Sequence, residues 1–345
     1  MAHRKQAPYY TGSLLAGAVG DALGAPIEFM SLDQIRSAFG PNGLSDYAPA
    51  YGRKGSITDD TQMTLFTAEG LILSRVRAEY RSRKGVIDAG YHALLRWLYT
   101  QETGLQDHLV NQFGTCSIVD GVLTGYQELF SQRAPGNSCL SALRSGRMGR
   151  INDPVNNSKG CGAVMRMAPV GLIYTDAAEA FDTGCRLGAI TRGHPTGYLT
   201  SGLFASMISL IIQGLSLTDA MDESLKFIKS KNGFEETLAS LENALDLAVN
   251  PIKVDAAIQK IGEGWVAEEA LGIAVFCALR AENNLERGLL MSVNHSGDSD
   301  STGSITGNLL GALLGVDAIP DPWIKGLELK EVIEETARDL LAQAL

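Results

Sequence analysis

The sequence predicts an all-α fold, and two observations support this. Wherever hydrophobic residues recur regularly they follow the helical period, as in residues 61–82, 217–231, 234–249 and 329–345. The alternation typical of half-buried strands is scarce. Loops rich in Gly, Asn, Pro and Ser separate the helical segments, notably residues 40–56, 131–162 and 191–197. We therefore expect helices packed on helices.

The length and composition fit one large globular domain. The chain has 345 residues, which exceeds the usual range for a single domain, but no linker-like segment divides it. Hydrophobic residues make up 45% and charged residues 20%, as in ordinary globular proteins. We expect a single domain over residues 1–345.

The charge balance excludes some partners. The formal net charge is −10, from 29 Lys and Arg against 39 Asp and Glu, so long-range electrostatics would repel a nucleic acid or an acidic membrane surface. We expect neither as a partner. A small anionic ligand stays possible where a metal or backbone amides override the global field.

The cysteines and the apolar segments indicate the compartment. Five scattered cysteines without metal-ligand spacing suggest reduced thiols. The apolar run near the N-terminus follows basic residues but is interrupted by glycines and Asp21, unlike a signal peptide. No stretch reaches the ~18 uninterrupted apolar residues of a membrane helix. We expect a cytoplasmic protein.

Two acidic turns precede apolar helices and indicate a metal site. In "NHSGDSDSTG", Asp298, Asp300 and Ser301 lie on a glycine-bearing turn, where they can converge on one cation. In "ITDDTQM", Thr58, Asp59 and Asp60 occupy a similar position. Ligand sets made only of oxygen suit Mg²⁺, Mn²⁺ or Ca²⁺ better than zinc or copper.

Each acidic turn also has a simpler interpretation as a helix N-cap. Ser, Thr and Asp commonly cap helices, and Asp59 with Gln62 approximates a capping box. Capping needs one side chain per helix, however, whereas the two turns supply four carboxylates. Because adjacent acids repel one another unless they are neutralised, the pair of turns favours a cation.

Two helices carry rows of small residues at every fourth position: Gly12, Ala16, Gly20 and Gly24 in one, and Gly303, Gly307, Gly311 and Gly315 in the other. Each interior glycine costs about 0.5–1 kcal/mol relative to alanine, so the rows need a compensating reason. Such a ridge lets another backbone approach closely. We predict that these helices cross tightly and bring the turn at residues 298–301 near residues 20–28.

Three further segments could contact a ligand. Residues 156–172 read as a flexible glycine loop before an apolar helix, either a plain turn or a nest for a phosphate. His194 precedes Pro195 in a turn, and a structural role is slightly favoured over ligand contact. Trp265 could pack in the core or stack on a base. The sequence around the serines and cysteines does not indicate a nucleophilic triad.

Five blocks occur in one order: "GSLLAGAVGDALGAPIEF", "ITDDTQM", "KGCGAVMRMAPVGL", "TRGHPTG" and "NHSGDSDSTGSITGNLLGALLG". Over residues 11–320 the chain resembles the ADP-ribosylglycohydrolase family, typified by the dinitrogenase reductase activating glycohydrolase and by arginine-directed ADP-ribosyl hydrolases. The resemblance implies a compact orthogonal helical bundle with a binuclear Mg²⁺ or Mn²⁺ centre in a cleft.

The resemblance also implies roles for individual residues. Metal ligands would be Thr58, Asp59, Asp60, Asp298, Asp300 and Ser301, the last replacing the threonine of many relatives. Glu28 matches a glutamate that approaches the metals in some members, and Glu28, Asp59 or Asp60 would accept a proton from the attacking water. Ser158, Gly160 and Gly162 would hold the diphosphate, and His194 would lie near the distal ribose or adenine.

The implied activity is metal-dependent hydrolysis that removes ADP-ribose from a modified protein side chain, with arginine as the expected linkage. Serine-linked or free ADP-ribose derivatives are the alternative substrates. Bacterial relatives suggest a further alternative, an immunity protein that neutralises a cognate ADP-ribosyltransferase toxin by hydrolysis or by occlusion. The ten or so residues before the first block are few for a plug, but the insertion around residues 100–150 could contact such a partner.

Overall fold

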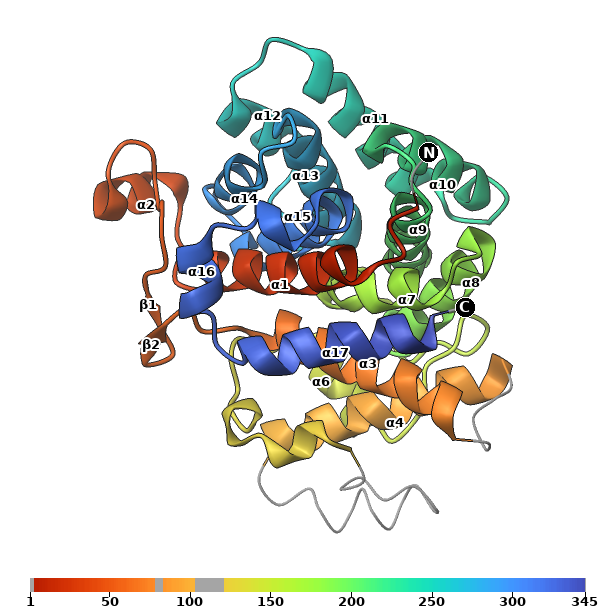
Figure 1. The fold of residues 1–345 in the computed structure, drawn as a ribbon. Coiled ribbons are helices and arrows are strands. Elements are labelled where there is room, and N and C mark those ends of the chain that lie inside the picture. Colours follow the sequence, from red (N-terminus) through yellow and green to blue (C-terminus); the bar gives the residue numbers. More distant parts are fainter. Residues whose placement is uncertain (1–2, 78–82, 103–120, 345) are drawn as a thin grey trace.

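The computed structural model describes residues 3–77, 83–102 and 121–344, and almost all of its regular structure is helical (Figure 1). The α-helices are α1 (Ala7–Gly24), α2 (Leu32–Phe39), α3 (Asp59–Val76), α4 (Arg83–Gln101), α6 (Asn137–Arg144), α7 (Ala168–Ile173), α8 (Ala177–Ala189), α9 (Pro195–Ile212), α10 (Leu217–Ile228), α11 (Glu235–Val249), α12 (Val254–Ile261), α13 (Ala267–Arg280), α14 (Leu285–Val293), α15 (Ser299–Leu314), α16 (Asp321–Gly326) and α17 (Lys330–Gln343). Short 3₁₀ turns are η3 (Leu123–Gly125), η4 (Gln127–Leu129), η5 (Cys161–Arg166) and η6 (Val316–Ala318). β1 (Pro49–Ala50) and β2 (Arg53–Lys54) form a small antiparallel hairpin at one edge.

Helices α1 and α15, from opposite ends of the chain, lie side by side in the middle of the molecule (Figure 1). Their glycines meet backbone to backbone: a Cβ atom on Gly307 would lie 2.0 Å from the carbonyl oxygen of Ala16, and one on Gly20 would lie 2.1 Å from that of Gly303. The predicted tight crossing is confirmed. The missing side chains are what allow the two backbones to approach.

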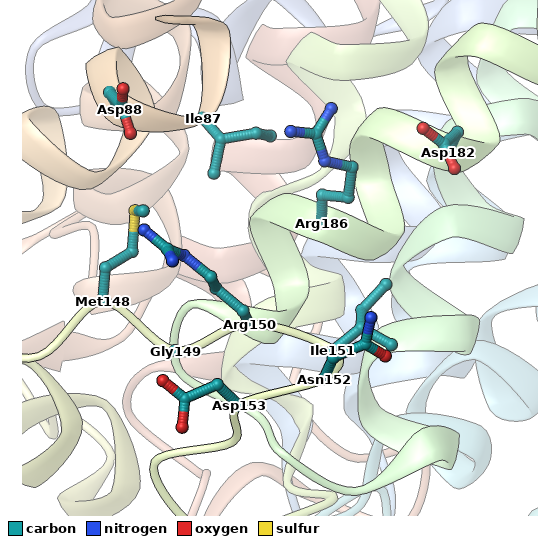
Figure 2. Close-up of a pocket in the computed structure, with 10 residues that line it drawn as sticks. All are labelled: Ile87, Asp88, Met148, Gly149, Arg150, Ile151, Asn152, Asp153, Asp182 and Arg186. Atoms are coloured by element: carbon teal, nitrogen blue, oxygen red, sulfur yellow. The ribbon is translucent and has the colours of Figure 1, made fainter. Parts of the chain in front are cut away.

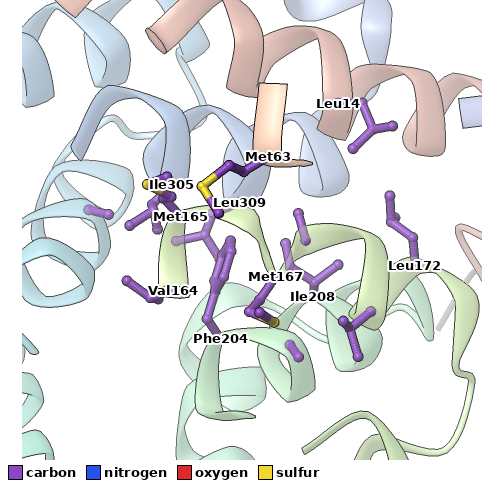
Figure 3. Packing of buried hydrophobic residues seen from close by; sticks show 14 of the residues in the cluster. Leu14, Met63, Val164, Met165, Met167, Leu172, Phe204, Ile208, Ile305 and Leu309 are labelled. Atoms are coloured by element: carbon purple, nitrogen blue, oxygen red, sulfur yellow. The ribbon is translucent and has the colours of Figure 1, made fainter. Parts of the chain in front are cut away.

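The larger of two hydrophobic clusters among the described residues joins helices from both ends and the middle of the chain (Figure 3). Leu14 of α1, Met63 of α3, Met165 of η5, Ile208 of α9 and Ile305 of α15 are all buried in it. Burial on this scale is the dominant stabilising contribution to folding. The core packs against the starts of α3 and α15, and thereby supports the two acidic turns.

The helical segments predicted from periodicity are confirmed, with shifts at their ends. Residues 217–231, 234–249 and 329–345 contain α10, α11 and α17, whereas α3 ends at Val76, earlier than predicted, and residues 78–82 lie outside the described part. The predicted loops at residues 40–56 and 131–162 contain the hairpin and α6, and α9 begins inside the loop predicted at residues 191–197. The strands of the hairpin and helix α6 have too few residues to show a period.

Helix α9 is the one described helix that is long and apolar enough to cross a membrane, and 89% of its apolar window is buried inside the protein. It behaves as a core helix. Cys139, Cys161, Cys185 and Cys277 are free thiols, as expected, while Cys116 lies outside the described residues. Residues 103–120, the centre of the insertion considered as a partner contact, also lie outside the described part.

Candidate functional site

The first acidic turn lies at the start of α3. Thr58 is the N-cap, and its side-chain oxygen accepts the backbone N–H of Asp60 at 3.2 Å. Asp59 and Asp60 follow in the first helical turn and are 5% and 3% exposed. Asp59 and Gln62 do not form the capping box that was the simpler alternative, because Thr58 is the N-cap and the Gln62 amide hydrogen-bonds to Ser131 and Trp97. Asp59 and Asp60 therefore remain free of a capping role.

The second acidic turn lies at the start of α15. Asp298 is the N-cap and accepts the backbone N–H of Ser301 at 3.2 Å. Asp300 and Ser301 are both 2% exposed, and the Asp300 carboxylate accepts the same N–H at 3.0 Å. Each helix thus uses one residue of its turn as a cap, and the remaining carboxylates need another explanation for their burial.

Glu28 joins the second turn from the segment that follows α1. One carboxylate oxygen each of Glu28, Asp298 and Asp300 can be chosen so that all three lie within 4.8 Å of one another. The end of α1 brings Glu28 there, since a Cβ on Gly24 would lie 2.3 Å from the backbone nitrogen of Asp300. The predicted proximity of residues 20–28 to the turn at 298–301 is therefore confirmed.

The two acidic turns are electrostatically coupled. Burial and the neighbouring Asp300 raise the pKa of Asp59, Asp60 and Asp298 well above the usual carboxyl range. Burial, followed by repulsion from Asp300 and Asp298, raises the pKa of Glu28 to about 11. Burial also raises the pKa of Asp300, an effect that Thr58 of the first turn, among other polar groups, partly offsets. A shared cation would relieve this repulsion and favour the ionised carboxylates.

Two buried carboxylate oxygens support this interpretation. Glu28 Oε2 and Asp60 Oδ1 are both shielded from solvent and have no hydrogen-bond partner in the described structure. A buried polar atom without a partner costs free energy, and most such atoms in proteins are satisfied. The donor set of carboxylate and hydroxyl oxygens fits a hard divalent cation.

Asp21, which in the sequence stands out only as an interruption of an apolar run, is a further functional candidate. It is fully buried in α1, and its carboxylate accepts the backbone N–H groups of Thr58 at 3.0 Å and Thr61 at 3.1 Å. The Thr61 hydroxyl also donates to it. Burial raises its pKa to about 7. An acid within an otherwise apolar, glycine-rich helix was the available signal.

A buried ion pair holds the other side of the α3 start. Arg133 donates to both carboxylate oxygens of Glu328, with Nη2 to Oε1 at 3.0 Å, and to the carbonyl of Ile57 at 2.9 Å. Glu328 also accepts the Ile57 N–H. A segment near the C-terminus therefore fixes the residue that precedes Thr58.

The glycine turn at residues 158–162 lies next to the second acidic turn. The Cys161 thiol donates to Asp298 Oδ2 at 2.8 Å, and burial raises its pKa well above the ordinary thiol value. The turn is less open than predicted, since the N–H of Gly160 is bonded to Ser158 Oγ and that of Cys161 to the carbonyl of Trp265. These two amides are therefore not free to form a phosphate nest.

Arg192 lies beneath this turn and was not identified from the sequence. It is 2% exposed, and its guanidinium donates to the carbonyls of Gly160 at 2.8 Å and Thr191 at 3.0 Å and to Cys139 Sγ at 3.2 Å. None of these acceptors is a carboxylate. A Cβ on Gly162 would lie 2.4 Å from Arg192 Nη2, so glycine is required there to make room for the guanidinium.

His194 and Trp265 flank the turn. His194 caps α9: its ring Nδ1 accepts the backbone N–H of Thr196 at 3.2 Å. The backbone N–H of His194 donates to the carbonyl of Ser158. This favours the structural role for His194. Trp265 is 38% exposed and stacks on Phe29, with ring centroids 5.9 Å apart, so it is not a core residue.

The predicted site residues thus come from five segments of the chain, around residues 28, 58–60, 158–162, 194 and 298–301, that lie near one another. A separate cavity of about 550 Å³ lies between α4, the segment at residues 148–153 and α8, and none of these residues lines it (Figure 2). Arg150 and Arg186 line that cavity together with three aspartates.

The fold and the site define a class of protein: an all-α protein in which two acidic helix starts converge with a glutamate on a candidate cation centre. A family model described as ADP-ribosylglycohydrolase matches residues 4–345. The chain belongs to the ADP-ribosylglycohydrolase family, whose activity is the hydrolytic removal of ADP-ribose.

Similar proteins agree with this assignment. ADP-ribosylhydrolase ARH3 of Mus musculus is 24% identical, with 97% of this chain and 90% of the relative covered. ADP-ribosylarginine hydrolase Tri1 of Pseudomonas putida is 22% identical, covering 96% and 78%, and the ADP-ribosyl-[dinitrogen reductase] glycohydrolase of Rhodospirillum rubrum is 23% identical, covering 92% and 90%. A solved structure, "ADP-ribosylglycohydrolase-related protein complex", matches with a TM-score of 0.65 and 21% identity over 99% of both chains, which supports the fold.

Proposed function

We propose that the protein hydrolyses the glycosidic bond between ADP-ribose and an arginine side chain of a modified protein, with two Mg²⁺ or Mn²⁺ ions as cofactors. The observation that carries this proposal is the convergence of Glu28, Asp298 and Asp300, with one ligand atom each within 4.8 Å of the others. The orphan oxygens of Glu28 and Asp60 support it, because a cation would satisfy both.

Each acidic turn would contribute one set of ligands. Thr58, Asp59 and Asp60 would hold the ions from the α3 side, and Asp298, Asp300 and Ser301 from the α15 side. Bound Mg²⁺ or Mn²⁺ would supply charge that orients the ribose hydroxyls and acidifies water. The tethering of the α3 start by Asp21 and by Glu328 would keep the two sets at a fixed separation.

The chain's own groups suit the remaining steps. Glu28, with Asp59 or Asp60 as alternatives, would accept a proton from the attacking water as the bond between the anomeric carbon and the guanidine nitrogen breaks with oxocarbenium character. The water oxygen bonds to the anomeric carbon, and the guanidine leaves with the bonding electron pair. Ser158 and Gly162 would contact the diphosphate, and Gly160 and His194 would shape the turn beside the diphosphate and the nucleoside, with the positive charge of Arg192 just behind it.

The arginine linkage is supported by the name of one relative, an ADP-ribosylarginine hydrolase. Serine-linked or free ADP-ribose derivatives remain the alternative substrates. Occlusion of a cognate transferase by the segment before α1 is less favoured, because Arg4 is anchored to the end of α9 by hydrogen bonds to Ile211, Ile212 and Leu215.

The experiment is release of ADP-ribose from an arginine-modified protein after the transferase has been removed. We expect release with Mg²⁺ or Mn²⁺, no release after chelation, and no release by an Asp60→Ala/Asp300→Ala double variant. A protein that carries ADP-ribose on serine, treated in the same way, is the control substrate for the linkage. Release from the serine-modified protein alone would overturn the linkage, and full activity in metal-free buffer would overturn the metal centre.

A further inference from the structure

Two exposed aromatic side chains form a stacked pair beside the acidic cluster. Phe29 directly follows Glu28 and is 74% exposed, and Trp265 is exposed as well. Their rings lie with centroids 5.9 Å apart and planes inclined by 16°. Large aromatic rings are mostly buried in folded proteins, and adjacent exposed ones commonly mark a binding surface. This aromatic pair has no part in the hydrolysis as described so far.

Backbone contacts hold Trp265 against the second acidic turn. The N–H of Asp298 donates to the carbonyl of Glu263 at 2.8 Å, and a Cβ on Gly264 would lie 3.3 Å from Asp298 Cβ. The carbonyl of Trp265 accepts the N–H of Cys161 at 3.1 Å. The backbone that carries the exposed indole is therefore fixed at the edge of the acidic cluster.

We propose that Phe29 and Trp265 form the subsite for the arginine side chain of the modified protein, whose planar guanidinium stacks on the exposed face of the aromatic pair. A guanidinium stacks on aromatic rings through its flat shape and its charge. A serine linkage offers neither. This inference rests on the proposed hydrolysis of ADP-ribosyl-arginine, and it deepens that proposal by naming residues that select the linkage.

The position of the aromatic pair favours the acceptor end of the substrate over the adenine end. In the proposed reaction the anomeric carbon lies at the acidic cluster, and the modified protein must extend from there into solvent. Phe29 and Trp265 are exposed and are attached to the backbone beside Glu28 and Asp298. The net charge of −10 also favours a cationic group at the surface.

A third exposed ring, Tyr51 in the turn between β1 and β2, lies near the same carboxylates. Burial, followed by repulsion from Glu28 and Asp300, raises the pKa of its phenol above the ordinary range. Its φ of +47° is uncommon for a residue other than glycine, and such conformations often occur at functional sites. The guanidinium carbon of Arg133 lies 5.8 Å from its ring centroid, so this region already contains one contact between a guanidinium and an aromatic ring.

Steady-state hydrolysis of an ADP-ribosyl-arginine peptide at saturating Mn²⁺ tests the inference. We expect Phe29→Ala and Trp265→Ala each to raise KM about tenfold with a smaller change in kcat, because the stacked side chain is held alike before and during bond cleavage. Trp265→Phe keeps a ring and should recover most of the affinity. The control is Phe39→Ala, which removes an exposed ring from α2 and should leave KM unchanged.

Inhibition by ADP-ribose distinguishes the two ends of the substrate. The inhibition constant of ADP-ribose should stay within about twofold of the wild type in Phe29→Ala and Trp265→Ala, since this product lacks the arginine. An inhibition constant that rises as much as KM would assign the rings to adenine and overturn the inference.

Agmatine, which carries the guanidinium without ADP-ribose, separates this inference from the proposed function. Trp97 and Trp323 are buried, so Trp265 is the accessible indole of the three in the chain, and agmatine should change its fluorescence. We expect the change to be lost in Trp265→Phe and kept in Phe39→Ala. Agmatine binding without hydrolysis of the arginine-linked peptide would overturn the proposed function but support the guanidinium subsite. Hydrolysis with wild-type KM in Phe29→Ala and Trp265→Ala would overturn the subsite alone.

Discussion

The carboxylate of Asp21 accepts the backbone N–H groups of Thr58 and Thr61, and so ties the middle of α1 to the start of α3. This contact orients the first acidic turn from behind. Asp21→Asn removes the charge that these donors face and leaves an amide NH₂ group to be satisfied, so we expect a loss of about 1–3 kcal/mol in the free energy of unfolding. Urea denaturation measures it, with the exposed Asp33→Asn as the control. Equal stability of the two variants would contradict the tethering role.

The crossing of α1 and α15 predicts a large cost for Gly307→Ala. The new methyl group would lie 2.0 Å from the Ala16 carbonyl oxygen, so one helix must move away. We expect destabilisation of about 2–4 kcal/mol, in spite of the higher helix propensity of alanine. The control is Gly125→Ala, where a Cβ would meet nothing within 4 Å. The idea fails if Gly307→Ala melts at the wild-type temperature.

Glu28 and Asp300 should differ in their effects. Asp300→Ala removes a central member of the acidic cluster, and we expect it to abolish Mn²⁺ binding and activity together. Glu28→Gln keeps the shape but cannot accept a proton, so we expect Mn²⁺ binding to persist while turnover falls about 100-fold or more. Isothermal titration calorimetry and single-turnover kinetics measure the two properties. Wild-type Mn²⁺ affinity in Asp300→Ala would remove that residue from the ligand set.

The raised carboxyl pKa values predict opposite pH trends with and without metal. Folding raises the pKa of Glu28 to about 11 and of Asp21 to about 7, so the folded state holds these protons more tightly than the unfolded chain does. Their contribution to the stability of the metal-free protein is therefore present below the unfolded pKa of roughly 4 and is lost as the pH rises toward the folded values.

Cation binding requires ionised carboxylates, so the stabilisation by Mn²⁺ should grow over the same pH range. Melting temperatures measured at several pH values from about 5 to 8, with and without Mn²⁺, give both trends. A Mn²⁺-induced shift that is independent of pH would argue against the carboxylate cluster as the binding site.

Arg192 should contribute to ligand affinity because its buried charge has only neutral acceptors. We expect Arg192→Lys to weaken ADP-ribose binding about tenfold, since an ammonium cannot support the Gly160 carbonyl and attract phosphate with the same geometry. The control is Arg147→Lys, on an exposed arginine paired with Asp153. Unchanged affinity in Arg192→Lys would assign the residue a purely structural role.

Local sequence patterns determined several helices, one helix–helix contact and several candidate site residues. The helical period identified α10, α11 and α17, the four-residue spacing of small residues predicted the contact of α1 with α15, and the two acidic turns identified Thr58, Asp60, Asp298 and Asp300 as neighbours of helix starts. Each of these features depends on residues within a few turns of one another. Composition and spacing are therefore sufficient to reveal them.

The tertiary structure decided what those residues meet. It sets Asp21 behind Thr58, places Cys161 against Asp298, and uses the Gly160 and Cys161 amides within the protein. These partners are separated by tens to hundreds of residues, and no local period encodes which polar group will satisfy another in the interior. Their pairing follows from the shared core, because buried polar atoms must find partners wherever the packing of the helices has placed them.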